Sequence, residues 1–119
     1  MNTPAATPQP LGELIARLST LHRQSIDLAL ERMQRLLQRL DHPERKLPPV
    51  IHIAGTNGKG STAAFLRAIL EAAGLRVHVF TSPYLVRINE CYRIGRSGGG
   101  TLADDDELRD AFEHCERVN

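Results

Sequence analysis

A glycine-rich turn between an apolar run and a helical pattern constrains this chain more than any other feature. The stretch Val50–Thr62 reads VIHIAGTNGKGST, with a lysine between the last two glycines and two hydroxyl residues after them. Glycines let backbone N–H groups approach an anion, the helix N-terminus supplies partial positive charge, and a lysine supplies a full charge. A hydroxyl at the end of such a turn can hold a magnesium ion that bridges phosphates. The stretch therefore predicts a phosphate-binding cradle.

The spacing in this cradle differs from the usual P-loop pattern, G-x-x-x-x-G-K-[ST]. Five positions before Gly58 stands Ile53 instead of glycine, and Gly60 separates Lys59 from Ser61. The order of apolar run, glycines, lysine, hydroxyls and helix still matches what phosphate binding needs. We therefore expect a compact variant of the phosphate loop.

A second pattern, the dinucleotide-binding form G-x-G-x-x-[GA], does match at Gly58, Gly60 and Ala63. That form also needs an acidic residue about 20 positions further on, which binds the ribose. The sequence has no acid between Glu71 and Glu90. A phosphate site with a lysine and a hydroxyl is therefore favoured. Two alternatives stay open, a dinucleotide-binding oxidoreductase domain and a nucleotide-binding module without chemistry.

Length and composition exclude few classes of protein, but they indicate which class to expect in the absence of other signals. The 119 residues suffice for one domain, and 15 basic residues balance 14 acidic ones, for a net charge of +1. This balance gives no argument for nucleic-acid binding. No run approaches the roughly 20 apolar residues of a membrane span. Cys91 and Cys115 are isolated, as expected of inert thiols in a reducing compartment. We expect a cytoplasmic protein with no nucleic-acid or membrane partner.

The hydrophobic periodicity predicts an α/β fold, a P-loop-type parallel sheet with flanking helices preceded by two N-terminal helices. Residues 1–10 are proline-rich and are expected to form a flexible tail, and residues 11–119 to belong to one domain. Helices are expected near residues 11–22 and 25–40, with Ser25 or Asp27 as the cap of the second. Val50–Ala54 and residues 76–80 are expected to be parallel strands. The helix between them, up to Ala73, should turn Phe65, Ile69 and Ala72 inward, completing a βαβ unit.

The chain leaves the second strand through Thr81–Glu90, TSPYLVRINE. Ligands in open parallel sheets lie beyond this edge, so Ser82 is expected near the phosphate site. Residues 91–94 suit a short strand, and residues 95–100 a glycine-rich loop. The acids from Asp104 to Glu107 open a last helix. They are expected to complement its positive N-terminus rather than to bind a metal.

With these motifs in hand, the chain resembles folylpolyglutamate synthase, in particular the bacterial form that is also dihydrofolate synthase. The resemblance rests on HIAGTNGKGST at 52–62, TSPYLVRINE at 81–90 and SIDLALERM at 25–33. It covers nearly everything from Leu11 onward. It implies the central ATP-binding domain of the Mur-ligase-like amide ligases. These enzymes use Mg-ATP to form an acyl phosphate, which the amino group of L-glutamate then attacks.

The resemblance implies roles for individual residues. Its substrates would be dihydropteroate or a folate, L-glutamate and ATP, with ATP and Mg²⁺ as cofactors and a monomer as the full-length form. Lys59 would be catalytic, neutralising charge on the γ-phosphate. The residues implied to wrap the ATP phosphates are Asn57, Gly58, Lys59, Gly60 and Ser61. Ser61 and Ser82 would bind the metal, and the residues implied to contact the pterin-bearing substrate are Ile26, Asp27 and Leu28.

Two departures from the family pattern stand out. Ile88 and Cys91 occupy places that usually hold an aromatic residue and an arginine, and the region Arg96–Thr101 is longer and richer in glycine. The family enzymes are also two-domain proteins far longer than this chain. We therefore expect a truncated ATP-binding domain that is inactive by itself. The motifs do not separate dihydropteroate addition from glutamate-chain extension.

Overall fold

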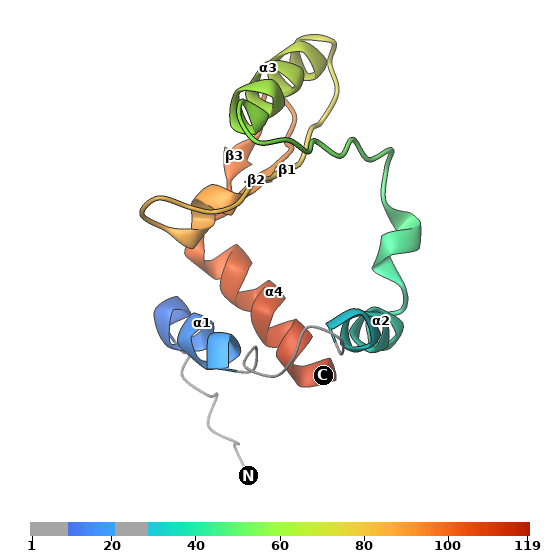
Figure 1. The fold of residues 1–119 in the computed structure, drawn as a ribbon, viewed down its shortest axis with the longest axis vertical. Helices are drawn as coiled ribbons and strands as arrows, with labels where there is room; N and C mark the ends of the chain where they lie inside the picture. The colour runs from blue at the N-terminus through green and yellow to red at the C-terminus, as the bar shows by residue number, and fades with distance from the viewer. Residues whose placement is uncertain (1–9, 21–28) are drawn as a thin grey trace. The chain divides into compact units, whose positions relative to one another are not determined.

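A computed structural model describes residues 10–20 and 29–119 (Figure 1). The chain divides into two compact units, one formed from Met1–Leu47 with Asp106–Asn119 and the other from Pro48–Asp105. The described residues leave out all of the expected tail at 1–10 except Pro10. They also leave out the expected helix caps, Ser25 and Asp27, and the expected substrate residues, Ile26, Asp27 and Leu28. The expectation of a single domain over residues 11–119 stays a prediction.

The first unit is helical. It contains α1 (Leu11–Thr20), α2 (Ala29–Arg39) and nearly all of α4 (Asp105–Val118). Leu14 on the apolar stripe of α1 is fully buried. Arg17 of α1 pairs with Glu116 at 2.6 Å, and the guanidinium of Arg39 donates to the carbonyl of Val118 at 3.1 Å. The apolar stripes predicted for the two N-terminal helical segments therefore form helices that contact α4.

The second helix stops where the sequence predicts. Asp41 and His42 both adopt positive φ angles, 60° and 51°, which a helix cannot continue through. Pro43 then begins a short 3-10 helix, Pro43–Lys46. The ammonium of Lys46 returns to the Asp41 carboxylate at 2.9 Å and closes this turn.

The second unit combines α3 (Lys59–Ala72) with a three-stranded sheet in the order β1-β2-β3. The strands are β1 (Val79–Phe80), β2 (Tyr92–Ile94) and β3 (Thr101–Leu102). Both pairings are antiparallel, with Val79 opposite Arg93 and Ile94 opposite Thr101. The small core of this unit includes Cys91 and Ala103, which are 5% and 2% exposed.

The expected parallel sheet is not confirmed. Val50–Ala54 forms no strand, and β1 covers only the end of the expected strand at 76–80. Val50 and Ile51 are 72% and 61% exposed, so no described segment covers this apolar run. A parallel strand is stable only with neighbours at its edges and layers on both faces. The antiparallel pairing of β1 with β2 needs just the local chain reversal over residues 81–91.

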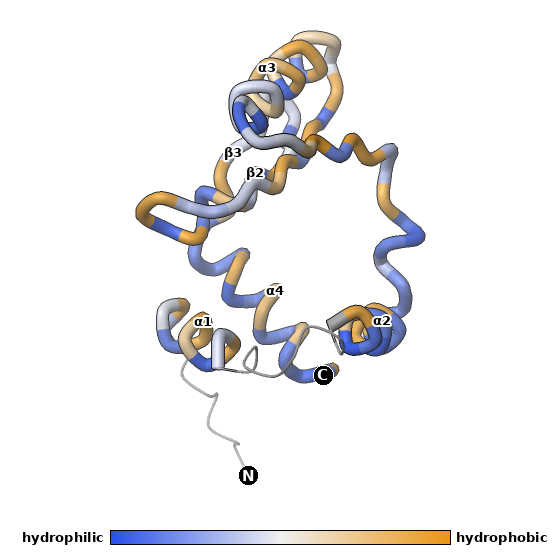
Figure 2. The backbone as a smooth tube through the Cα atoms, in the orientation of Figure 1, coloured by the Kyte–Doolittle hydropathy of each residue, from blue (hydrophilic) through white to orange (hydrophobic). Residues whose placement is uncertain are grey.

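The prediction that Phe65, Ile69 and Ala72 of α3 face inward is wrong for the described structure. Phe65 and Ile69 are 69% and 67% exposed, and Ala72 is exposed as well. Figure 2 shows where hydrophobic residues lie along α3. The helix forms where the alanine-rich pattern places it, and Gly74 follows its end with a φ of 84°. Phe65 and Ile69 are exposed because the parallel sheet that they were expected to cover does not form among the described residues.

The connection between β2 and β3 is anchored to α3 through Glu71. The Gly100 N–H donates to the Glu71 carboxylate at 3.0 Å, and Arg67 pairs with the same carboxylate at 2.6 Å. Gly95 passes so close to the chain at Val77 that an added Cβ would lie 2.6 Å from the Val77 nitrogen. Glycine is therefore required at this crossing, and the glycine-rich region is a packed turn at this point.

Candidate phosphate-binding site

The glycine turn before α3 has a backbone that favours glycine. Gly55 and Gly58 have φ angles of 152° and 74°, and Gly58 is the residue that precedes the helix. An added Cβ at either glycine would meet nothing within 4 Å, so conformation rather than crowding selects glycine. All residues from Gly55 to Thr62 are exposed. The turn is thus open to a ligand from solution.

The first turn of α3 supplies the donors for an anion. Lys59, Gly60 and Ser61 are its first three residues, and the first N–H groups of any α-helix lack intrahelical acceptors. Thr62 donates both its N–H and its hydroxyl to the Gly58 carbonyl, at 2.9 and 2.8 Å. That double contact holds the turn against the helix, so the helix begins in a defined geometry.

Lys59 folds back onto the turn it follows. Its ammonium donates to the carbonyls of Gly55 at 2.5 Å and Thr56 at 3.3 Å. The positive charge therefore lies beside the glycine turn and beside the N-terminus of α3. Partial and full positive charges at one exposed point favour an anion such as a phosphate.

Ser61 and Ser82 are the two hydroxyl residues predicted to bind metal. Ser61 lies in the first turn of α3, and Ser82 stands two residues after β1 in an exposed segment. The peptide bond between Ser82 and Pro83 is cis. Both hydroxyls suit Mg²⁺, which prefers oxygen ligands and retains several waters. Among the described residues, no group of three His, Cys, Asp or Glu side chains forms a ready metal site.

Sequence reasoning missed a polar cluster that follows Ser82. Glu90 accepts the backbone N–H groups of Leu85, Val86 and Arg87, at 3.0, 2.9 and 2.8 Å. These hydrogen bonds hold the pKa of the Glu90 carboxyl below its ordinary value. The available signal was a glutamate three positions after Arg87, the spacing at which a carboxylate can reach back to backbone N–H groups.

Asn89 and Asp105 complete this polar cluster. The Asn89 amide is buried and donates to the Ala103 carbonyl at 3.0 Å and to the Asp105 carboxylate at 2.9 Å. Arg87 pairs with the same Asp105 oxygen at 2.7 Å. Asp105 therefore works as an acceptor for the preceding loop. Asp106, its neighbour in the acidic run, pairs instead with Arg109.

Cys91 is buried beside this cluster, and burial raises the pKa of its thiol, with the charge of Glu90 acting in the same direction. A thiol with a raised pKa is a poor nucleophile at neutral pH. The prediction of an inert cysteine is consistent with this environment.

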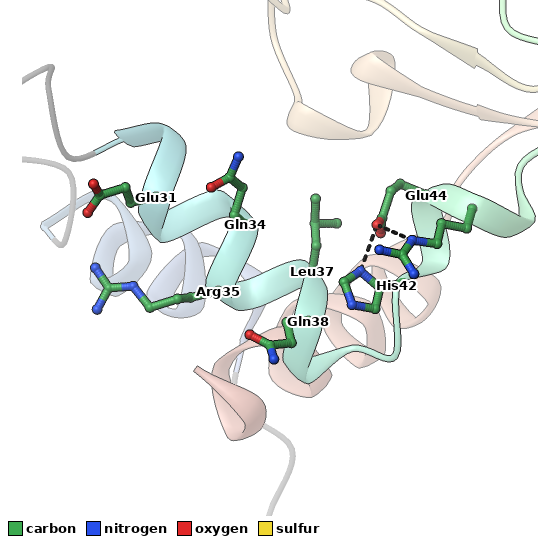
Figure 3. Close-up of a pocket in the computed structure, with 8 residues that line it drawn as sticks. Glu31, Gln34, Arg35, Leu37, Gln38, His42 and Glu44 are labelled. Carbon is green, nitrogen blue, oxygen red and sulfur yellow. Dashed lines mark hydrogen bonds and ion pairs between the residues drawn. The ribbon is translucent and has the colours of Figure 1, made fainter.

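A hollow of about 560 Å³ lies in the helical unit, well separated in sequence from the glycine turn. Figure 3 shows its lining side chains, which come from α2, from His42 and from the following 3-10 helix. His42 contacts Glu44 at 2.8 Å and Arg45 lies 3.7 Å from the same carboxylate, so the Glu44 carboxylate has its partners within the hollow. None of the predicted site residues within the described part of the chain lines it, and we assign it no function.

None of the described helices combines the length and the apolar character that a bilayer crossing needs.

No protein-family model matches this chain. Curated relatives do. The dihydrofolate synthase/folylpolyglutamate synthase of Escherichia coli is 45% identical over 91 residues, which are 74% of this chain and 21% of that protein. The protein of the same name from Bacillus subtilis is 56% identical over 61 residues, 51% of this chain and 14% of the relative. The chain thus spans about a fifth or less of the curated relatives it matches.

Solved structures give the same result over nearly the whole chain. The bifunctional folylpolyglutamate synthase/dihydrofolate synthase from Yersinia pestis has a TM-score of 0.78 at 42% identity, covering 98% of this chain and 27% of that one. The Lactobacillus casei folylpolyglutamate synthetase has a TM-score of 0.77 at 32% identity, covering 92% of this chain and 26% of its own. An Escherichia coli complex described as containing DHPP and ADP has a TM-score of 0.78 at 38% identity, covering 98% and 27%.

The structural neighbours define the class first, because they are Mur-ligase-like proteins. Within that class, this chain is homologous to a part of the dihydrofolate synthases and folylpolyglutamate synthases. The resemblance carried by the glycine turn and by TSPYLVRINE is thereby confirmed. The roles of individual residues are a separate matter and remain predictions.

Proposed function

We propose that this chain carries the phosphate-binding part of an ATP-dependent amide ligase. The ligase would add L-glutamate to dihydropteroate or to folates through an acyl-phosphate intermediate, in folate biosynthesis and polyglutamylation. The observation that carries the proposal is the convergence of the Lys59 ammonium, the exposed glycine turn and the N-terminus of α3. The relatives' names supply the substrate class.

The residues divide the work by chemistry. Backbone N–H groups from Asn57 to Ser61 wrap the phosphates, and Lys59 leaves the Gly55 and Thr56 carbonyls to neutralise charge on the γ-phosphate. The hydroxyl oxygens of Ser61 and Ser82 would hold the magnesium ion. When bound, Mg²⁺ offsets phosphate charge and aligns the γ-phosphate for transfer to a carboxylate. Catalysis of this kind is electrostatic positioning, in which one well-placed donor contributes about 3–4 kcal/mol to lowering the barrier.

Two titrations of this chain test the proposed ligand class. Calorimetry with Mg-ATP and with NAD under matched conditions should give binding of ATP that is tighter than binding of NAD. The reason is that the cradle has a lysine and hydroxyls but no acidic residue placed for a ribose. Tighter binding of NAD would reject the ligase proposal and favour a dinucleotide-binding oxidoreductase.

A third titration separates the ligase from a nucleotide-binding module without chemistry. Dihydropteroate added to the ATP-bound chain should shift the amide resonances of Ile26, Asp27 and Leu28. Unchanged resonances at saturating dihydropteroate, together with ATP binding, would favour the module.

A further inference from the structure

The loop that carries Ser82 is tied at its base by the backbone. The Thr81 N–H donates to the Cys91 carbonyl at 3.0 Å, directly beyond the pairing of Phe80 with Tyr92. The residues between these two points form a closed loop that begins with Ser82. Its base is therefore fixed to the antiparallel sheet.

The outer part of the loop has little apolar burial to hold it. Leu85 and Val86 are 92% and 80% exposed, and Tyr84 is 46% exposed. Two nearly fully exposed aliphatic side chains contribute almost nothing to hydrophobic stabilisation, which scales with the area removed from water. Polar contacts must therefore fix the conformation of this segment.

Glu90 supplies most of those polar contacts. Its two carboxylate oxygens accept three successive backbone N–H groups, with Leu85 on one oxygen and Val86 and Arg87 on the other. Hydrogen bonds to an ionised acceptor are roughly twice as strong as neutral ones. A single side chain thus gathers the backbone of three consecutive residues around one charge.

Further hydrogen bonds fix the residues next to Glu90 in the chain. Asn89 is 7% exposed and is held by the Ala103 carbonyl and the Asp105 carboxylate. Arg87 reaches the same carboxylate. Arg87 and Asn89, which both precede Glu90, are therefore anchored to the segment that enters α4.

We propose that Glu90 is a positioning residue that fixes the loop from Ser82 to Arg87, and so holds the Ser82 hydroxyl in place for the metal–nucleotide complex. This inference rests on the proposed function for the role of Ser82, but not for the clamp itself. Glu90 would not touch the nucleotide or the substrate.

The first test measures the clamp without any ligand. In Glu90→Gln, the backbone N–H groups of Leu85, Val86 and Arg87 should exchange with solvent about tenfold faster or more, because a charged acceptor has been lost. The N–H of Ala103, bound to the Tyr92 carbonyl at 2.8 Å, should keep its exchange rate and report an intact sheet. Unchanged exchange at residues 85–87 would overturn the proposal.

The second test measures the consequence for the metal. ATP affinity of this chain is determined with and without Mg²⁺, in the unaltered chain, in Glu90→Gln and in the control Glu44→Gln. Glu44 makes its contacts with His42 and Arg45 in the other unit. Glu90→Gln should lose most of the gain in affinity that Mg²⁺ gives, about tenfold, while its metal-free ATP affinity stays within about twofold.

The outcomes distinguish the two claims. A variant that keeps the full magnesium-dependent gain overturns the positioning role, and equal losses with and without Mg²⁺ also overturn it, because general unfolding would produce them. Failure of the unaltered chain to bind ATP at all would reject the proposed function and, with it, the metal role of the loop. The exchange measurement would then still decide whether Glu90 clamps residues 85–87.

Discussion

At the scale of residues, the glycine turn combines a conformational requirement with a charge. Gly58 needs a positive φ to enter α3, and Lys59 immediately after it places an ammonium over the turn carbonyls. The lysine contacts the carbonyl oxygens of Gly55 and Thr56, so a phosphate has to compete with them. The competition favours phosphate because a full negative charge attracts the ammonium more strongly than carbonyl dipoles do.

Lys59→Ala should therefore strongly weaken ATP binding by this chain. A hydrogen bond to a charged group is worth about 1.5–3 kcal/mol, or roughly 10- to 150-fold in affinity. Calorimetry with Mg-ATP measures the loss. His52→Ala is the control because His52 lies in the apolar run before the turn, and it should leave binding largely intact. Equal loss in both variants would indicate damage to the fold instead.

Acid pH should weaken the sheet unit through Glu71. The hydrogen bond from the Gly100 N–H, with help from the nearby Arg67, holds the pKa of Glu71 below its ordinary value of 4.5. A group whose pKa is lowered by folding contributes stability above its unfolded pKa and loses it as pH falls through the folded pKa. The contribution should thus be complete at neutral pH and disappear below pH 4.5.

The measurement for Glu71 is urea unfolding of Glu71→Gln and of the unaltered chain at neutral and at acid pH. The difference in free energy of unfolding between the unaltered chain and Glu71→Gln should become smaller as pH falls. Glu13→Gln, which changes an exposed carboxyl on α1, is the control. A difference in free energy of unfolding that stays constant with pH would contradict the proposed contribution of Glu71.

At the scale of elements, the small sheet depends on close backbone crossings. Gly95 crosses the chain at Arg76 and Val77, where a Cβ would lie 2.6–2.9 Å from three backbone atoms. Backbone atoms cannot rotate away as side chains do, so the strand segments would have to separate. The glycine-rich region that departs from the family pattern therefore contains one glycine with a defined packing role.

Gly95→Ala should destabilise the sheet unit by about 1–3 kcal/mol, the usual cost of overpacking. Hydrogen exchange of the Thr81 and Ala103 N–H groups, which bond to Cys91 and Tyr92, reports on this sheet. Gly12→Ala on α1 has no atom within 4 Å of the added Cβ and should leave those rates unchanged. Protection that persists in Gly95→Ala would show that the crossing can relax.

At the scale of the whole molecule, apolar surface remains in the open. Val50, Ile51, Phe65 and Ile69 are all more than 60% exposed, in the unit that holds the cradle. The relatives are more than three times as long as the part that this chain matches. The residues of the cradle are present, and no described residue buries these four apolar side chains.

We therefore expect the isolated 119-residue chain to be inactive as a ligase. ATP, L-glutamate and dihydropteroate incubated with it should release no phosphate above the background without protein. Lys59→Ala at the same concentration is the control for contaminating ATPase. Steady-state turnover that disappears in Lys59→Ala would refute the expectation.

The sequence alone predicted the four α-helices of the described residues and the resemblance to the relatives. The α1, α2, α3 and α4 segments follow from apolar periodicity, and the stop at Asp41–Pro43 follows from residues that cannot continue a helix. The motif TNGKGST and the loop TSPYLVRINE identified the relatives. These features are local, so a chain carries them whatever it packs against.

Tertiary structure alone decided the pairing of strands and the contacts of the loop. Val50–Ala54 has the composition of a buried parallel strand, yet it pairs with no strand in the part of the chain that the structure describes. Strand formation depends on neighbours that composition does not supply. The clamp by Glu90 and the buried Asn89 between Ala103 and Asp105 join residues whose proximity no periodicity encodes. The propensity of a segment to form a helix depends on its own residues. Strand pairing and the hydrogen-bond partners of polar side chains depend on which segments lie next to one another in the folded chain.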